Sequence, residues 1–275
     1  MIINKNEIEK LFQYYFECKQ DQIKWEYDHL TRNPLVSYSE MTDKSFIESI
    51  FSSDERNRSN NINYNCIDVS DYEGANIIHD LNKPVKSELY SKFDFIYDGS
   101  CIDNVFDPAC FVINISKMLK PNGRTIILTH SSLYPGAFVM LSPEWLFSYF
   151  AVNNYKYCTV IVSSTKYEKS WLNSKTDFFE YSPSFTRNPN YNRFIASQSD
   201  SILLTFAIAQ KGDESTNTEK PIQLHYANNV QNELVYSKYE LWKKQYTEIK
   251  TLKIKDPIPR LPLDSDHFTY LGSSS

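Results

Sequence analysis

Acidic side chains close successive apolar segments between Asn65 and Gly99. The segments are 66–69, 75–80 and 93–99, and they carry Asp68, Asp80 and Asp98. In open α/β sheets, ligands bind beyond the carboxyl ends of parallel strands, so acids at such ends line a binding crevice. Carboxylate oxygens accept hydrogen bonds from hydroxyl groups. The pattern therefore predicts a nucleoside-like ligand.

A histidine follows the next apolar strand segment along the chain. His130 comes directly after residues 125–129 and is the best candidate for a general base, because an imidazole exchanges protons near neutral pH. The alternative is a histidine that is simply hydrogen-bonded at a strand end. The chain has five histidines with no H-x-x-H or H-E-x-x-H spacing, so we expect no dedicated metal site.

Turn and capping signals indicate the elements that position these residues. Asp107-Pro108 and Ser142-Pro143 each combine a capping side chain with proline at the first helical position, which predicts two helix starts. Helix, turn and strand 125–129 follow strand 93–99, and this order predicts a parallel crossover. We expect further strands at 157–162 and 202–209. Upstream we expect a helix at 6–27, a strand at 35–38 and a helix at 42–51.

Composition limits the class of protein. The chain has 275 residues, a net charge of -5 and 41% hydrophobic residues, as suits one α/β domain with decorations. The mild acidity argues against nucleic acid as the main partner. No apolar run reaches the roughly 18 residues that a membrane span requires. The five cysteines are scattered without C-x-x-C pairs, and we expect a cytoplasmic protein.

Several motifs in fixed order resemble the class I, S-adenosylmethionine-dependent methyltransferases. Residues 93–96 and 100–108 look like that family's fourth strand and the loop after it, 118–124 is similar to its turn before strand five, and 142–146 resembles a helix start downstream. The resemblance implies an α/β, Rossmann-like methyltransferase fold, with a mostly parallel seven-stranded sheet, helices on both faces and an aromatic insertion between the last two strands. It implies an N-terminal helical segment at 1–33, the methyltransferase domain at 34–211 with an insertion or lid at 163–200, and a C-terminal helical extension and tail at 212–275.

The resemblance also implies a cofactor, S-adenosyl-L-methionine, and residues that bind it. Asp68 corresponds to the acid that holds the ribose hydroxyls, and Asp80 with Leu81 to the adenine contacts. The positions under the methionine portion of the cofactor are Asp98, Gly99 and Ser100. The position in the loop after the first strand is Ser39. The alternative is that Asp68 and Asp80 are turn or cap acids. The family's glycine-rich loop is degenerate here, since no glycine precedes Gly74.

The catalytic and acceptor residues follow from the same resemblance. Asp103 stands where the family has glutamate, and it is the second catalytic candidate besides His130. Tyr134, Phe138, Arg187 and Arg193 are the candidates for binding a small polar acceptor, such as a saccharide or a nucleotide-linked metabolite. The alternative is that the aromatic residues pack an enlarged subdomain.

Two functional classes stay open. One is a methyltransferase with a divergent cofactor loop, and the other is a catalytically inactive relative that serves as a binding or scaffolding protein. Tyr239 and Trp242 recur at helical spacing, and this helix packs either on the body or on a second subunit as a homodimer. The last residues, 256–275, are expected to form an extended tail.

Overall fold

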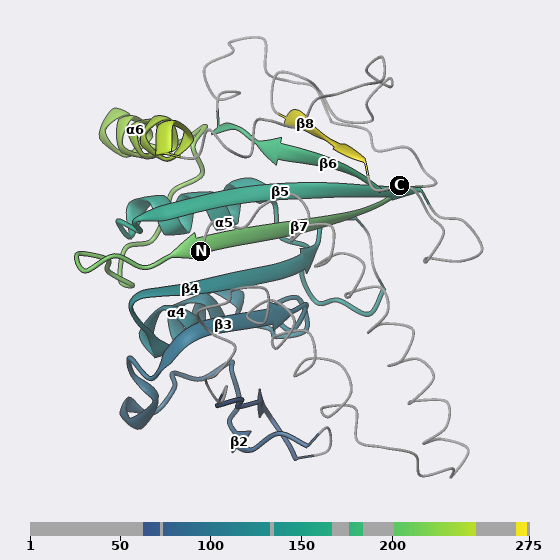
Figure 1. Ribbon diagram of the computed structural model, residues 1–275, viewed down its shortest axis with the longest axis vertical. Helices are drawn as coiled ribbons and strands as arrows, with labels where there is room; N and C mark the ends of the chain where they lie inside the picture. The colour runs from purple at the N-terminus through teal and green to yellow at the C-terminus, as the bar shows by residue number, and fades with distance from the viewer. Residues whose placement is uncertain are drawn as a thin grey trace, which may run out of the picture. The chain divides into compact units, whose positions relative to one another are not determined.

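The computed structural model describes residues 63–71, 74–132, 135–166, 176–183, 201–245 and 268–273 (Figure 1). The chain divides into two compact units, Met1–Lys83 and Pro84–Ser275. In the first unit, β1 (Ile67–Asp68) and β2 (Ile77–Ile78) pair in parallel. The elements expected at 6–27, 35–38 and 42–51 lie outside the described residues.

The second unit is built on a six-stranded mixed sheet with the order β3-β4-β7-β5-β6-β8 (Figure 1). Its strands are β3 (Phe93–Gly99), β4 (Leu119–His130), β5 (Tyr157–Lys166), β6 (Thr176–Tyr181), β7 (Ser201–Gln210) and β8 (Phe268–Ser273). β3 and β4 pair in parallel, and the other neighbours pair antiparallel. The prediction of a mostly parallel, seven-stranded Rossmann-like sheet is therefore wrong.

The direction of each strand relative to its neighbour depends on the connection between them. A parallel pair needs a long crossover, usually a helix, and α4 (Pro108–Met118) supplies it between β3 and β4, which confirms the predicted parallel crossover. β7 pairs antiparallel with both β4 and β5, and β6 pairs antiparallel with β5 and β8. A fully buried strand is an apolar run whichever way its neighbour runs, so the runs at β5 and β7 did not reveal their direction.

The predicted aromatic insertion contributes in part to this sheet. Its residues 176–181 form β6, and Phe178, Phe179 and Tyr181 are buried there. For these three side chains, the interpretation as packing residues is the one that the structure supports. Residues 167–175 and 184–200 of the insertion lie outside the described ranges.

Both predicted helix starts are confirmed. The Asp107 side chain accepts a hydrogen bond from Cys110 N at 2.9 Å at the start of α4. Ser142 accepts one from Trp145 N at 3.2 Å at the start of α5 (Pro143–Val152). Each cap satisfies a backbone N–H that has no partner inside the helix. Of the described helices, none is both long enough and apolar enough to cross a bilayer.

The C-terminal part of the chain packs on the same sheet. In α6 (Asn229–Gln245), Tyr239 and Trp242 are buried against Phe147 of α5, with ring centroids 6.0 and 5.4 Å away. The predicted helix thus packs on the body of the protein. The expected tail at 256–275 includes β8, which pairs with β6. An edge strand of this kind is specified by a partner distant in sequence, which local patterns do not report.

A fully buried amide connects α5 to the segment after β7. Asn153 Nδ2 donates to the carbonyl oxygens of Tyr149 and Glu219, both at 2.9 Å. Asn153 Oδ1 accepts from Thr216 Oγ1 at 2.8 Å and from Glu219 N at 3.1 Å. All four hydrogen-bonding positions of the amide are therefore used.

Asn153→Asp is expected to lower the free energy of unfolding by about 2 kcal/mol, because a carboxylate oxygen would face two buried carbonyl oxygens in place of an N–H donor. Asn154→Asp is the matched control, since Asn154 is exposed and Asp tolerates its positive φ of 54°. Urea denaturation of both variants measures the difference. Equal midpoints for the two variants would contradict the structural role of Asn153.

Candidate active site

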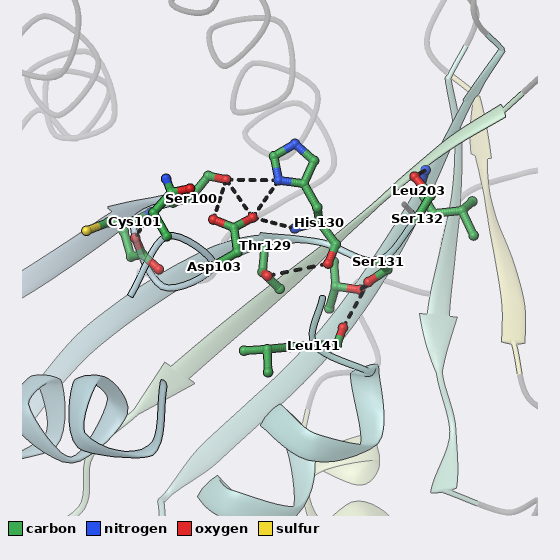
Figure 2. Close-up of polar contacts among 12 residues, drawn as sticks. Ser100, Cys101, Asp103, Thr129, His130, Ser131, Ser132, Leu141 and Leu203 are labelled. Carbon is green, nitrogen blue, oxygen red and sulfur yellow. Dashed lines mark hydrogen bonds and ion pairs between the residues drawn. The ribbon is translucent and has the colours of Figure 1, made fainter. Parts of the chain in front are cut away.

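The parallel pair brings distant polar residues to one edge of the sheet. β3 ends at Gly99 and β4 ends at His130, and parallel strands have their carboxyl ends at the same edge. The loop that follows β3 carries Ser100 and Asp103. Figure 2 shows these two side chains directed at His130. The strand ends thus assemble residues that are 27 to 30 positions apart in the chain.

Asp103 and His130 form a close buried pair. Asp103 Oδ2 lies 2.5 Å from His130 Nδ1 and also accepts from the backbone N of His130 at 3.1 Å. The Asp103 side chain is 1% exposed and the His130 side chain 9%. Ser100 Oγ lies 3.0 Å from each Asp103 carboxylate oxygen and 3.1 Å from His130 Nδ1. The carboxylate therefore fixes both the position and the rotation of the imidazole ring.

This geometry defines which ring nitrogen can act. Because Nδ1 faces a carboxylate oxygen, the ring hydrogen of the neutral imidazole resides on Nδ1. The basic lone pair is then on Nε2, which Figure 2 shows on the side of the ring away from Asp103. A proton taken up at Nε2 gives an imidazolium that the Asp103 carboxylate stabilises. The pair is suited to general acid or base catalysis.

Ser100 is not placed as a nucleophile. In a Ser-His-Asp triad, the serine contacts the imidazole nitrogen opposite the one that the aspartate holds. Here Ser100 Oγ and Asp103 Oδ2 both contact Nδ1. A protonated Nδ1 cannot accept the hydroxyl proton, so Ser100 serves to hold the carboxylate of Asp103. Ser100 itself is 2% exposed.

The loop that carries Ser100 is strained and internally braced. Ser100 has φ 81°, a left-handed conformation that costs a residue with a side chain about 1–3 kcal/mol. Asn104 Nδ2 donates to the Ser100 carbonyl oxygen at 3.0 Å, and Asp98 Oδ1 accepts from Cys101 N at 2.7 Å. A Cβ at Gly99 would lie 3.1 Å from the Tyr97 ring, a tight contact that the ring could relieve only by shifting. Such strain commonly accompanies functional loops.

The loop between β4 and α5 is hydrogen-bonded to Asp103. The backbone N–H groups of Phe138 and Val139 donate to the Asp103 carbonyl oxygen at 2.8 and 3.3 Å. Ser131 Oγ donates to the Leu141 carbonyl oxygen at 3.1 Å, as Figure 2 shows. Phe138, a predicted acceptor residue, is 68% exposed. Tyr134, Arg187, Arg193 and Ser39 lie outside the described residues.

The two acids of the first unit differ in their surroundings. Asp68, the last residue of β1, is half-buried, and its Oδ1 accepts from Ser70 N at 3.0 Å. Asp80 Oδ1 accepts from the side-chain and backbone nitrogens of Asn82 at 3.0 Å, and its Oδ2 lies 3.2 Å from Lys83 Nζ. The hydrogen bonds from Asn82, with a smaller effect of Lys83, lower the pKa of Asp80. Asp80 thus has the contacts of a turn acid, and neighbouring Leu81 is buried.

Comparison of the chain with protein-family models, with curated proteins and with solved structures finds no match. The similarity to class I methyltransferases therefore stays a prediction from motifs.

The sequence indicated Asp103 and His130 as catalytic residues and Ser100 as a cofactor contact, but it did not predict their mutual contacts. One signal could have found them, because the acid and the histidine each follow a strand of the same predicted parallel crossover. The contact of Asn104 with the Ser100 carbonyl oxygen was missed. No periodicity distinguishes Asn104, since it lies in the irregular loop between β3 and α4.

Proposed function

We propose that this chain transfers a methyl group from S-adenosylmethionine to a small acceptor, with His130 as the general base and Asp103 as the residue that orients it. The observation that carries the proposal is the 2.5 Å contact between Asp103 Oδ2 and His130 Nδ1 at the carboxyl ends of a parallel strand pair. Ligands of α/β sheets bind at such ends.

The proposed work of the protein is to position the acceptor and remove its proton. When bound, S-adenosylmethionine supplies an activated methyl group. His130 accepts the proton of the acceptor hydroxyl or amine at Nε2, and Asp103 stabilises the resulting imidazolium. Ser100 keeps the Asp103 carboxylate in place. General base catalysis of this kind contributes roughly 10²–10⁴-fold to a rate.

The candidate cofactor residues fit unequally. Asp68 uses Oδ1 in its own turn, and a half-buried carboxylate can still offer Oδ2 to a ribose hydroxyl. Asp98 and Ser100 are 4% and 2% exposed and use their side chains within the loop, so they would shape the site rather than bind the cofactor through side chains. We also propose a cytoplasmic location, because the five cysteines are scattered along the sequence without C-x-x-C pairs.

Calorimetric titration of the full chain with S-adenosylmethionine and S-adenosylhomocysteine tests the cofactor. Asp68→Ala is expected to weaken binding about tenfold, the effect of losing a hydrogen bond to a charged group. Asp71→Ala is the matched control, because Asp71 is an exposed acid close in sequence whose backbone carbonyl, not its side chain, accepts from Gly74 N. Unchanged affinity in Asp68→Ala would contradict a contact between Asp68 and the cofactor.

A binding or scaffolding protein without catalysis is the second candidate. The observation that favours it is that carboxylate oxygens of Asp80 and Asp98 already bind neighbouring groups of the chain, through hydrogen bonds and, for Asp80, an ion pair. If the chain gives no heat of binding with S-adenosylmethionine or with S-adenosylhomocysteine, and neither compound competes for binding to it, this candidate is favoured over methyl transfer.

A further inference from the structure

One buried hydroxyl group lies on the same face of the sheet as the side chain of His130. In the sheet register, Leu204 of β7 is opposite His130 of β4 on one side and opposite Ser163 of β5 on the other. Directly opposed residues of neighbouring strands have their side chains on the same face. His130, Leu204 and Ser163 therefore form one row across three strands.

This row lies at the edge of the sheet that carries the candidate active site. β7 runs antiparallel to both β4 and β5, so β4 and β5 run in the same direction. Their carboxyl ends, His130 and Lys166, are therefore at the same edge as the end of β3. Ligands of α/β sheets bind at such ends. Ser163 is thus at the ligand-binding edge, although it is distant in sequence from Ser100 and Asp103.

The Ser163 hydroxyl has no hydrogen-bond partner in the part of the chain that the structure describes. Ser163 is 0% exposed, so bulk water does not supply one. Thr165, the next residue of β5 on the same face, has Oγ1 2.9 Å from Thr176 Oγ1 and is satisfied. A buried polar group without a partner is uncommon in native proteins. A bound ligand would give the Ser163 hydroxyl the partner that the chain does not.

The Ser163 side chain faces away from α5. Phe147 of α5 contacts the ring of Tyr181, which is three residues after Phe178, the partner of Ser163 in β6. Successive side chains of a strand alternate between the two faces, so Tyr181 and Phe178 lie on opposite faces. α5 therefore covers the face that Ser163 does not use. Ser148 of α5 is a second buried hydroxyl without a partner among the described residues, on that other face.

The spacing of the row limits the size of a ligand that contacts both ends. Neighbouring strands lie about 4.8 Å apart, so the backbones of His130 and Ser163 are about 10 Å from each other. A hydrogen bond of about 2.8 Å at each end leaves roughly 4–5 Å between two polar atoms of the ligand. The residue between the two ends, Leu204, is apolar and matches an aliphatic body.

We infer that Ser163 binds the acceptor, and that the acceptor is an aliphatic compound with two hydroxyl groups about 4–5 Å apart. This inference rests on the proposed function, in which His130 is the base for the reacting hydroxyl. Ser163 Oγ forms a hydrogen bond with the second hydroxyl and so selects which hydroxyl meets His130. The saccharide acceptor suggested by the sequence belongs to the same class of polyhydroxy compounds.

The test compares two probes that differ by one hydroxyl group. Saturation-transfer NMR of the full chain measures binding of cyclohexane-1,3-diol and of cyclohexanol. The parent is expected to bind the diol about tenfold more tightly, the effect of one added hydrogen bond. Ser163→Ala is expected to bind both probes alike. Its affinity for S-adenosylmethionine and its urea midpoint should equal those of the parent, because the substitution removes no hydrogen bond within the described chain.

Ser148→Ala is the matched control, since it also removes a buried hydroxyl without a partner among the described residues, and it should keep the preference for the diol. Equal binding of the two probes by the parent, or a preference that persists in Ser163→Ala, overturns this inference alone. A preference that depends on Ser163, in a chain that binds neither S-adenosylmethionine nor S-adenosylhomocysteine, overturns the proposed function instead.

Discussion

His130→Asn is expected to lower the turnover of methyl transfer by about 10²–10⁴-fold with little change in cofactor affinity. The Asn side chain can place an N–H donor near the position of the imidazole Nδ1, so the contact with Asp103 Oδ2 can be kept. It carries no basic nitrogen that could replace Nε2. The loss should therefore appear in kcat, measured as S-adenosylhomocysteine formed with an acceptor that the parent chain methylates.

Asp103→Asn is the companion variant. One amide oxygen can accept from both Nδ1 and the backbone N of His130, as Oδ2 does, while the negative charge is removed. Turnover should fall because the imidazolium loses its counter-charge, and the fold should be retained.

A substrate-independent measurement accompanies these variants. In the parent chain, ¹⁵N NMR of the His130 ring should report the hydrogen of the neutral form on Nδ1. Turnover by His130→Asn close to that of the parent would refute the general-base role, and a neutral ring protonated mainly at Nε2 would refute the assignment of the basic nitrogen.

Phe147→Ala is expected to reduce the free energy of unfolding by about 3–5 kcal/mol. The Phe147 side chain is 1% exposed and contacts the rings of Tyr181 in β6 and of Tyr239 and Trp242 in α6. Removing it opens a cavity where the sheet, α5 and α6 meet. Urea denaturation followed by tryptophan fluorescence measures the change, because Trp242 is one of the reporters.

The control for this prediction uses the same residue type on the surface. Phe106 is 81% exposed, so Phe106→Ala should change the free energy of unfolding by less than about 0.5 kcal/mol. Phe147→Leu should fall between the two variants because it refills part of the cavity. A cost below about 1 kcal/mol for Phe147→Ala would mean that α6 does not depend on this contact.

Much of the local structure follows from signals within a few residues. Asp107-Pro108 and Ser142-Pro143 begin α4 and α5 as predicted, since a capping side chain and a proline act on the adjacent backbone alone. The helical spacing of four apolar residues also accounts for the buried face of α4, which carries Phe111, Val112, Ile115 and Met118. The apolar runs at β5 and β7 were likewise identified as strands.

The amino-acid sequence by itself was sufficient for these elements and for naming Asp103 and His130 as reactive side chains. It was not sufficient for strand direction, for the pairing of β8 with β6, or for the contact of Asp103 with Nδ1 of His130. These features depend on which distant segments pack together. An apolar strand buries the same side chains beside a parallel or an antiparallel neighbour, so the folded chain alone distinguishes the two arrangements.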